Sequence, residues 1–319
     1  MRVVLGIICA ALSVWGAQAQ TYPTKPVRII VPYAPGGIVD TSARVVGQKL
    51  AEKWGQQVVV ENRPGGNGFI GTVAAAKSPA DGYTLLTAHT GEFAVSPAVF
   101  PNIPFDLDRD FTAITMVTDA PMVIVVNSKT PYQTLQELIA AARAKPGTIG
   151  VSSPGIASIN HLVLEWMNLA TGVKFLHVPY RGGAPAITAT AGGEVPVGKA
   201  ALGSAMPHIK TGRVRVVAVT TATRSFVDKS WPTMMESGVP GVSSSIWAGL
   251  FAPKGVPQPI IDKIYADVAE ILKLPDVKAR FAAGGGVTGG MPPAEFAAAI
   301  RKEAASLKIV VAKAGVKPE

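Results

Sequence analysis

Residues 65–71 read Gly-Gly-Asn-Gly-Phe-Ile-Gly, and from Gly66 they match the spacing G-x-G-x-x-G. In dinucleotide-binding proteins this turn joins a strand to a helix, and its N–H groups hold a pyrophosphate. Such a site also needs an acidic residue about twenty positions farther on, at the end of the next strand. Here the next strand-like run ends at residues 89–90, with Asp81 before it and Glu92 beyond it. The sequence therefore argues against a nicotinamide or flavin site.

A second glycine pattern, at residues 193–199, matches G-x-x-x-x-G-K. A phosphate-binding P-loop would continue with Ser or Thr, which binds magnesium, but Ala200 stands there. Pro196 also removes one of the backbone N–H groups that would contact phosphate. We reject this site as well.

Other catalytic patterns are incomplete. The sequence has no H-E-x-x-H and no G-x-S-x-G. No two histidines have metal-ligand spacing; they are His89, His161, His177 and His208. We predict no metal and no cofactor. An exported α/β hydrolase that uses Ser152 or Ser153 remains an alternative, although neither serine has a base at a recognisable spacing.

The start of the chain predicts export. Arg2 precedes an apolar stretch at residues 3–15, and Ala-Gln-Ala at residues 17–19 is typical of signal-peptide cleavage. We assign residues 1–19 to a signal peptide and expect a periplasmic protein. Cys9, the one cysteine, would leave with that peptide, so the mature chain would have no thiol chemistry.

The charge pattern does not indicate nucleic-acid binding. The formal net charge is +9, but the Lys and Arg residues are scattered and form no run of five or six. A mild positive excess suits an anionic small ligand and equally suits ordinary solubility.

The first part of the chain alternates strand-like and helix-like segments. β-Branched runs at residues 27–31, 57–61 and 83–88 predict strands, and the apolar spacing of residues 41–54 and 69–77 predicts helices. This order implies a parallel sheet with helices on both faces.

A second block with the same alternation begins near Met122. Its predicted strands are residues 122–126, 148–152, 173–177, 214–220 and 247–252. Its predicted helices are residues 134–143, 159–170, 184–191, 259–272 and 294–307. We therefore predict an α/β fold of two lobes, each a mainly parallel sheet flanked by helices, joined by two crossing strands.

The loops that follow these strands share one composition. They are rich in glycine, serine and threonine, and loops at the carboxyl ends of parallel strands gather where ligands bind. Glycine lets the backbone approach a ligand, and helix starts offer free N–H groups with a positive dipole end. Such loops favour a carboxylate.

With these loops, the chain resembles the Bug family of periplasmic solute receptors, which are the substrate-binding proteins of tripartite tricarboxylate transporters. The resemblance covers the mature chain and rests on long motifs in order. They include Ala-Pro-Gly-Gly-x-x-Asp at residues 34–40, Val-Glu-Asn-Arg-Pro-Gly-Gly-Asn-Gly at residues 60–68 and His-Val-Pro-Tyr-Arg-Gly at residues 177–182.

The resemblance implies a type II periplasmic-binding-protein fold that closes on a small carboxylate. This ligand would be a di- or tricarboxylate, an aromatic acid or an acidic amino acid. Lobe 1 would comprise residues 20–122 and 245–319, and lobe 2 residues 123–244. The protein would be a monomer without catalytic activity that delivers its ligand to membrane permease subunits, and a sensor kinase of a two-component system is the alternative partner.

The resemblance also assigns ligand-binding residues. In lobe 1 they are Tyr33, Pro35, Gly36, Gly37, Thr41, Gly68, His89 and Thr90. In lobe 2 they are Ser152, Ser153, Ser158, Tyr180, Arg181 and Gly182.

Three further positions receive interpretations of their own. Asp40 is expected to cap its helix or tie the preceding loop. Glu92 is interpreted as a solvated loop acid, with acceptance of a ligand amine as the alternative. The family usually has Asp after Gly-Gly-Gln-Val, but this chain reads Gly-Gly-Glu-Val-Pro at residues 192–196, which makes the cleft wall near Lys199 uncertain.

Overall fold

The computed structural model describes residues 22–317. The predicted signal peptide and Cys9 lie outside the described residues. Among those that are described, no helix combines the length and the apolar character needed to cross a membrane.

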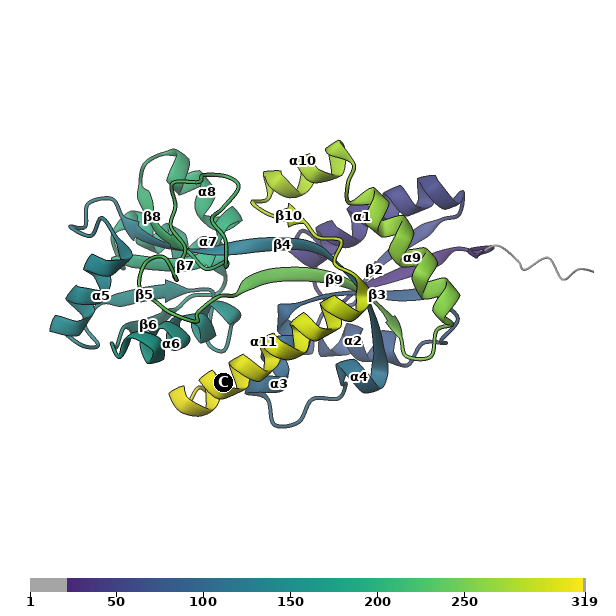
Figure 1. Ribbon diagram of the computed structural model, residues 1–319, viewed down its shortest axis with the longest axis horizontal. Helices are drawn as coiled ribbons and strands as arrows, with labels where there is room; N and C mark the ends of the chain where they lie inside the picture. Colours follow the sequence, from purple (N-terminus) through teal and green to yellow (C-terminus); the bar gives the residue numbers. More distant parts are fainter. Residues whose placement is uncertain (1–21, 318–319) are drawn as a thin grey trace, which may run out of the picture.

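Two lobes lie side by side, and two long strands run from one to the other (Figure 1). The strands form one curled, mixed sheet in the order β2-β1-β3-β9-β4-β7-β5-β6, with β8 and β10 also paired to β4. This confirms the predicted two-lobed α/β class.

Lobe 1 begins with a parallel arrangement built from β-branched runs. Strand β1 (Val27–Val31) pairs with β2 (Val58–Asn62) and with β3 (Thr84–His89). Helices α1 (Ile38–Trp54) and α2 (Phe69–Ala76) connect them. Every strand-to-helix loop of this arrangement consequently opens at one edge of the sheet.

The crossing strands are β4 (Phe111–Asn127) and β9 (Ser245–Pro253), which pair antiparallel. After Pro121 in β4, the strand leaves β9 and pairs with strands of lobe 2. Strand β4 therefore starts eleven residues before the predicted 122–126 strand. Because β4 passes between the lobes without a break, the domain boundaries at 122/123 and 244/245 stay a prediction.

Lobe 2 repeats the parallel arrangement. Its parallel strands are β6 (Leu176–Pro179), β5 (Gly150–Ser153) and β7 (Val197–Ala201), and β7 and β8 (Val214–Val219) pair antiparallel with β4. Its helices are α5 (Leu135–Ala144), α6 (Ile159–Thr171), α7 (Gly183–Gly192) and α8 (Leu202–Lys210). The sequence analysis missed β7 and α8.

Short elements and the C-terminal helices complete lobe 1. The short ones are η1 (Gly66–Gly68), η2 (Gly91–Val95), α3 (Ser96–Val99), α4 (Leu107–Asp110) and β10 (Val287–Thr288). The helices are α9 (Gln258–Ile271), α10 (Pro275–Ala283) and α11 (Pro293–Ala314). Helix α11 packs on α3 and β4 and reaches α6 of lobe 2, so it bridges the two lobes (Figure 1).

One apolar core runs through both lobes. It contains Phe93, Phe251 and Phe296 in lobe 1 and Ile124 and Leu162 in lobe 2. Because these side chains pack as one cluster, the crossing strands are held on a continuous apolar base and can position loops from both lobes against one another.

Candidate functional site

A cavity of about 610 Å³ lies between the lobes, where loops from both meet. A smaller cavity of about 390 Å³ adjoins it, and the two share Ala201, Ser204 and Ile246. We call the two together the cleft. Its walls come from the loops after β1 and β3 on one side and the loop after β5 on the other.

Four helix starts converge on the cleft. Helix α6 presents its N-cap Ser158, α7 its first residue Gly183, α8 its N-cap Ala201 and α1 its first residue Ile38. The first N–H groups of a helix lack partners inside it and carry the positive end of the helix dipole. The cleft therefore offers an anion several donors without a fixed counter-charge.

Two residues of the cleft have an unusual backbone. Asn67 and Ala157 have φ of 55° and 56°, and they are the non-glycine residues with positive φ in residues 22–317. One comes from each lobe, and both line the larger cavity. Backbone strain of this kind persists at ligand-binding positions, where surrounding contacts hold it.

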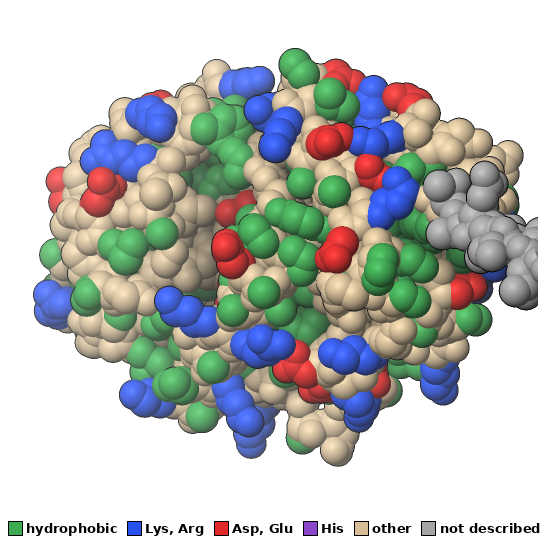
Figure 2. All heavy atoms as spheres, turned by 45° about the vertical axis from the view of Figure 1, so that its right-hand side comes forward, with side chains coloured by type: hydrophobic (Ala, Val, Ile, Leu, Met, Phe, Trp, Pro, Cys, Tyr) green, Lys and Arg blue, Asp and Glu red, His purple; other side chains and the backbone are tan. Residues whose placement is uncertain are grey.

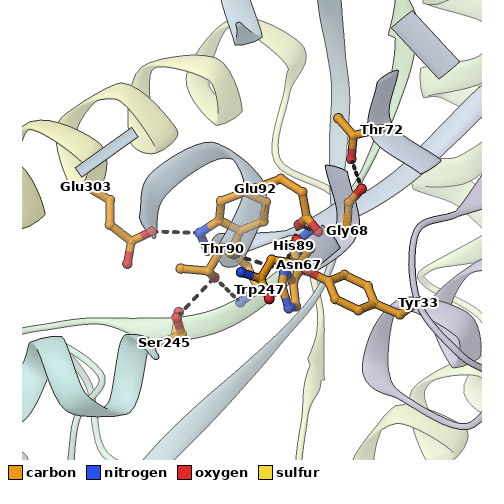
Figure 3. A network of polar contacts seen from close by, with 11 residues as sticks. Tyr33, Asn67, Gly68, Thr72, His89, Thr90, Glu92, Ser245, Trp247 and Glu303 are labelled. Atoms are coloured by element: carbon orange, nitrogen blue, oxygen red, sulfur yellow. Dashed lines mark hydrogen bonds and ion pairs between the residues drawn. The ribbon is translucent and has the colours of Figure 1, made fainter. Parts of the chain in front are cut away.

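A histidine and a buried acid lie side by side at the lobe 1 wall of the cleft (Figure 3). Nδ1 of His89 lies 2.7 Å from Oε2 of Glu92, and the backbone N–H of His89 donates to the same oxygen at 2.9 Å. Glu92 is fully buried, whereas the His89 side chain is 23% exposed and lines the cavity. The interpretation of Glu92 as a solvated loop acid is wrong, because η2 turns its side chain into the protein.

Contacts within the pair shift the pKa values of both side chains. Burial alone would lower the pKa of His89, but the charge of Glu92 and its hydrogen bond outweigh burial and raise that pKa above the usual value. Burial would raise the pKa of Glu92, but His89, with a smaller contribution from Tyr33, lowers it. The geometry thus pairs an imidazole whose pKa is raised with a buried carboxylate whose pKa is lowered.

Tyr33 completes this corner of the cleft. Its ring lies 4.8 Å from that of His89, and its hydroxyl donates to the carbonyl of Asn67. Burial, followed by the charge of Glu92, raises its pKa far above the usual value, so the hydroxyl stays neutral. A Cβ at Gly68 would collide with Glu92 and Tyr33, which explains glycine at this position.

Thr90 connects the cleft to the crossing strand β9. Its hydroxyl accepts from the Trp247 backbone N–H at 3.1 Å and donates to the Ser245 carbonyl at 3.4 Å (Figure 3). Thr90 is buried and lines the cleft. The loop after β3 is thereby fixed to a strand that enters lobe 2.

The predicted site residues do not all reach the cleft. Six of them line it: Tyr33, Gly36, Thr41, His89, Thr90 and Ser158. Pro35 and Gly37 are exposed beside Gly36, and Gly68 is buried beneath Tyr33. Tyr180, Arg181 and Gly182 lie outside both cavities, although the next residue, Gly183, lines one.

The two predicted serines of β5 are buried. The Ser152 hydroxyl donates to the Ala186 carbonyl and contacts the Thr190 hydroxyl. Oγ of Ser153 lies 2.6 Å from Nε2 of His177, a partner that sequence spacing did not reveal. Both serines are completely enclosed, so neither is placed to attack a substrate in the cleft.

Asp40 ties the loop before its helix, as expected. Its carboxylate accepts from the Gly36 N–H at 2.9 Å and also contacts Arg44 and Asn62. The N-cap position itself belongs to Gly37, which has no side chain to cap with. Because Gly36 lines the cleft, Asp40 positions the cleft wall rather than the ligand.

The sequence analysis missed several cleft residues. They are Asn67, Ile156, Asn160, Ser204, Ile246 and Arg280. Ser204 lies on α8, which was not predicted, and Arg280 lies on α10, far along the chain. Asn67 sat inside the glycine loop that was noticed, and its known tolerance of positive φ was the available signal.

The described surface shows how charged side chains and possible metal ligands are distributed. On the face in Figure 2, Lys and Arg side chains are scattered among acidic and apolar ones, and a hollow separates the lobes. Residues 22–317 hold no group of three or more His, Cys, Asp or Glu side chains that could bind a metal ion.

Comparisons with known proteins agree on one family. Residues 42–315 match the family described as the tripartite tricarboxylate transporter family receptor, TctC. Protein BugT of Bordetella pertussis is 38% identical over 284 residues, which cover 88% of this chain and 87% of BugT.

Solved structures show the same fold. A structure of R. palustris Rpa4515 with adipate is 32% identical, has a TM-score of 0.79 and matches 93% of this chain and all of that one. MatC of Rhodopseudomonas palustris with bound malate is 29% identical, has a TM-score of 0.75 and matches 91% of this chain and all of that one.

Proposed function

This chain belongs to the receptor family of tripartite tricarboxylate transporters, and from that premise we propose that it captures a small dicarboxylate in the cleft for delivery to a membrane permease. The membership confirms the resemblance seen in the sequence. The family consists of solute-binding receptors, which also confirms that the chain is not an enzyme. The hydrolase alternative is therefore wrong.

The convergence of four helix starts on the cleft carries the proposal. A carboxylate there accepts hydrogen bonds from main-chain N–H groups and gains from the positive dipole ends. His89 adds a positive charge that Glu92 stabilises. Two or three charge-assisted bonds of roughly 1.5–3 kcal/mol each bring micromolar affinity within reach.

The second cavity supports a ligand with two carboxylates. Arg280 lines it and forms no ion pair with another described residue. A guanidinium is suited to a carboxylate because its N–H groups match the two oxygens. Adipate and malate, seen in the two related structures, are both dicarboxylates. We assign one carboxylate to the His89 side of the cleft and the other to the Arg280 side.

The place of action follows from the family. Its members are periplasmic binding proteins, and the lobes of such proteins close around the ligand between them. We propose that the closed form docks the permease subunits of a tripartite transporter. The sensor-kinase partner considered from the sequence stays an untested alternative.

A panel of acids tests the proposal. A ligand that binds only the folded state raises the melting temperature, so a thermal-shift screen of mono-, di- and tricarboxylates should single out C4–C6 dicarboxylates. Calorimetry on the best ligand should then give a micromolar dissociation constant. Arg280→Gln should weaken the dicarboxylate about tenfold and leave the corresponding monocarboxylate unchanged. Equal affinity of the wild-type protein for both acids would contradict the second contact.

A further inference from the structure

A separate cavity lies behind the crossing strands. Asp119 of β4 stands directly opposite Trp247 of β9, so both side chains leave the sheet on one face. Both line a space of about 790 Å³ that is bounded by residues of both lobes. Their neighbours Ala120 and Ile246 line the cleft on the other face. We call this space the hinge-back cavity.

Two carboxyl groups from different elements face the hinge-back cavity. Glu303 of α11 accepts from the Ser244 hydroxyl at 2.6 Å and from the Trp247 indole N–H at 2.7 Å. These two bonds fix the orientation of the carboxyl group (Figure 3 shows the bond to Trp247). Oδ1 of Asp119 is buried and has no hydrogen-bond partner among the described residues.

Neither acid has a cation of its own in residues 22–317. Burial raises the pKa of Asp119, and burial together with the neighbouring Asp119 raises that of Glu303. Each carboxylate is thus held in surroundings that disfavour its charge, and a cation between them would relieve both. The basic side chains around the cavity are Arg224, Lys229 and Lys302, and Arg224 is already paired with Glu236.

The walls of the hinge-back cavity are aromatic. Trp166, Trp247, Phe226 and Phe296 line it, and the Trp247 and Phe296 rings meet edge to face at 5.2 Å. Aromatic faces attract organic cations, whereas a bare metal ion needs more ligands than two carboxyl groups. The volume is in the range that holds a drug-sized molecule.

We propose that the hinge-back cavity is a second ligand site, which binds an arylalkyl amine with its ammonium group between Asp119 and Glu303. The aromatic ring of the amine packs among the tryptophan and phenylalanine side chains. This site is independent of the carboxylate cleft, because the sheet formed by β4 and β9 separates the two.

Calorimetry with 2-phenylethylammonium on the whole exported chain tests this site. The amine should bind at pH 7.5 at least tenfold more tightly than 2-phenylethanol, which has the same ring without the charge. The anion 3-phenylpropionate should not compete with it. Glu303→Gln and Asp119→Asn should each weaken the amine about tenfold or more.

The substituted proteins and a matched control distinguish a loss of amine binding from a loss of folding. A glutamine at position 303 can still accept from the Trp247 indole, so the fold should survive, and a melting curve verifies this. Glu295→Gln removes an exposed carboxylate from the same helix and serves as the matched control, with no change expected. Equal binding of the alcohol, no binding at millimolar amine, or unchanged affinity in both folded variants would each overturn the proposal.

Discussion

His89 and Glu92 are joined by a bond of 2.7 Å between Nδ1 and Oε2, with the acid fully buried and the imidazole at the cleft wall. The acid cannot reach the ligand itself, since it lies beneath Tyr33 and Gly68. Its contribution is to raise the pKa of His89 through its charge and its hydrogen bond. In this way a negative residue would favour the carboxylate ligand that we propose for the cleft.

Carboxylate affinity should consequently depend on pH. His89 has a raised pKa in the folded protein, so it is charged below that pKa and becomes neutral as the pH rises through it. We expect affinity to be highest on the acidic side and to fall about tenfold or more as His89 loses its proton. Calorimetry between pH 5.5 and 9 checks this, with a ligand whose own carboxylates titrate below that range.

Glu92→Gln should move the loss of affinity to lower pH. Glutamine can still contact His89 but carries no charge, so the pKa of His89 should fall and affinity at pH 7.5 should drop. A pH profile that is the same in both proteins would show that His89 does not supply the charge.

Gly37→Val should abolish carboxylate binding and leave the fold intact. Gly37 has φ of −79°, and a Cβ built there meets no atom within 4 Å, so valine is tolerated. The added isopropyl group would stand at the first N–H groups of α1, where the ligand is proposed to lie. A wild-type melting curve combined with retained affinity by calorimetry would contradict the placement of the ligand.

Most of the fold follows from local patterns. Strand β1 was predicted with its observed bounds, because its run of β-branched residues is typical of a strand. Helix α6 was predicted to within one residue, because its apolar residues recur at helical spacing. Strand β7 escaped because its sequence Val-Gly-Lys-Ala-Ala contains a glycine and a lysine that read as a loop. Helix α8 escaped because Pro207 lies inside it, and proline normally ends a helix.

The site was harder to predict than the fold. The glycine loops indicated which strand ends face the ligand, and Tyr33, His89 and Ser158 do line the cleft. The position of Arg280 could not be inferred, since it depends on how α10 packs against the cleft. The Ser153–His177 contact likewise depends on the register of β5 against β6, which a sequence pattern does not determine.

Thr90→Val should destabilise the protein. Valine has nearly the same shape but cannot accept from the Trp247 N–H, and this buried donor would lose its partner. An unpaired buried N–H costs about 1–3 kcal/mol, which is a fall of several degrees in melting temperature. Thr90→Ser keeps the hydroxyl and should remain near wild type. If the valine variant melts like the serine variant, the hydroxyl does not anchor the loop.

Lys199→Met should stabilise the protein and remove one pH dependence. Lys199 is completely buried in β7, and within residues 22–317 its Nζ atom has a single hydrogen-bond partner, the sulfur of Met122 at 3.6 Å. Burial lowers its pKa to about 7. Methionine fills a similar volume without a charge, and replacing such a buried charge by an apolar side chain contributes about 1–4 kcal/mol.

The direction of the pH effect follows from the lowered pKa. An unfolded lysine keeps its proton up to about pH 10, so between about pH 7 and pH 10 the unfolded state binds more protons than the folded state. The free energy of unfolding of the wild-type protein should therefore rise with pH across this window. Urea unfolding at several pH values should show that rise in the wild type and lose much of it in Lys199→Met. A variant that is less stable than the wild type at pH 7 would mean that Lys199 has a charged partner in the folded protein.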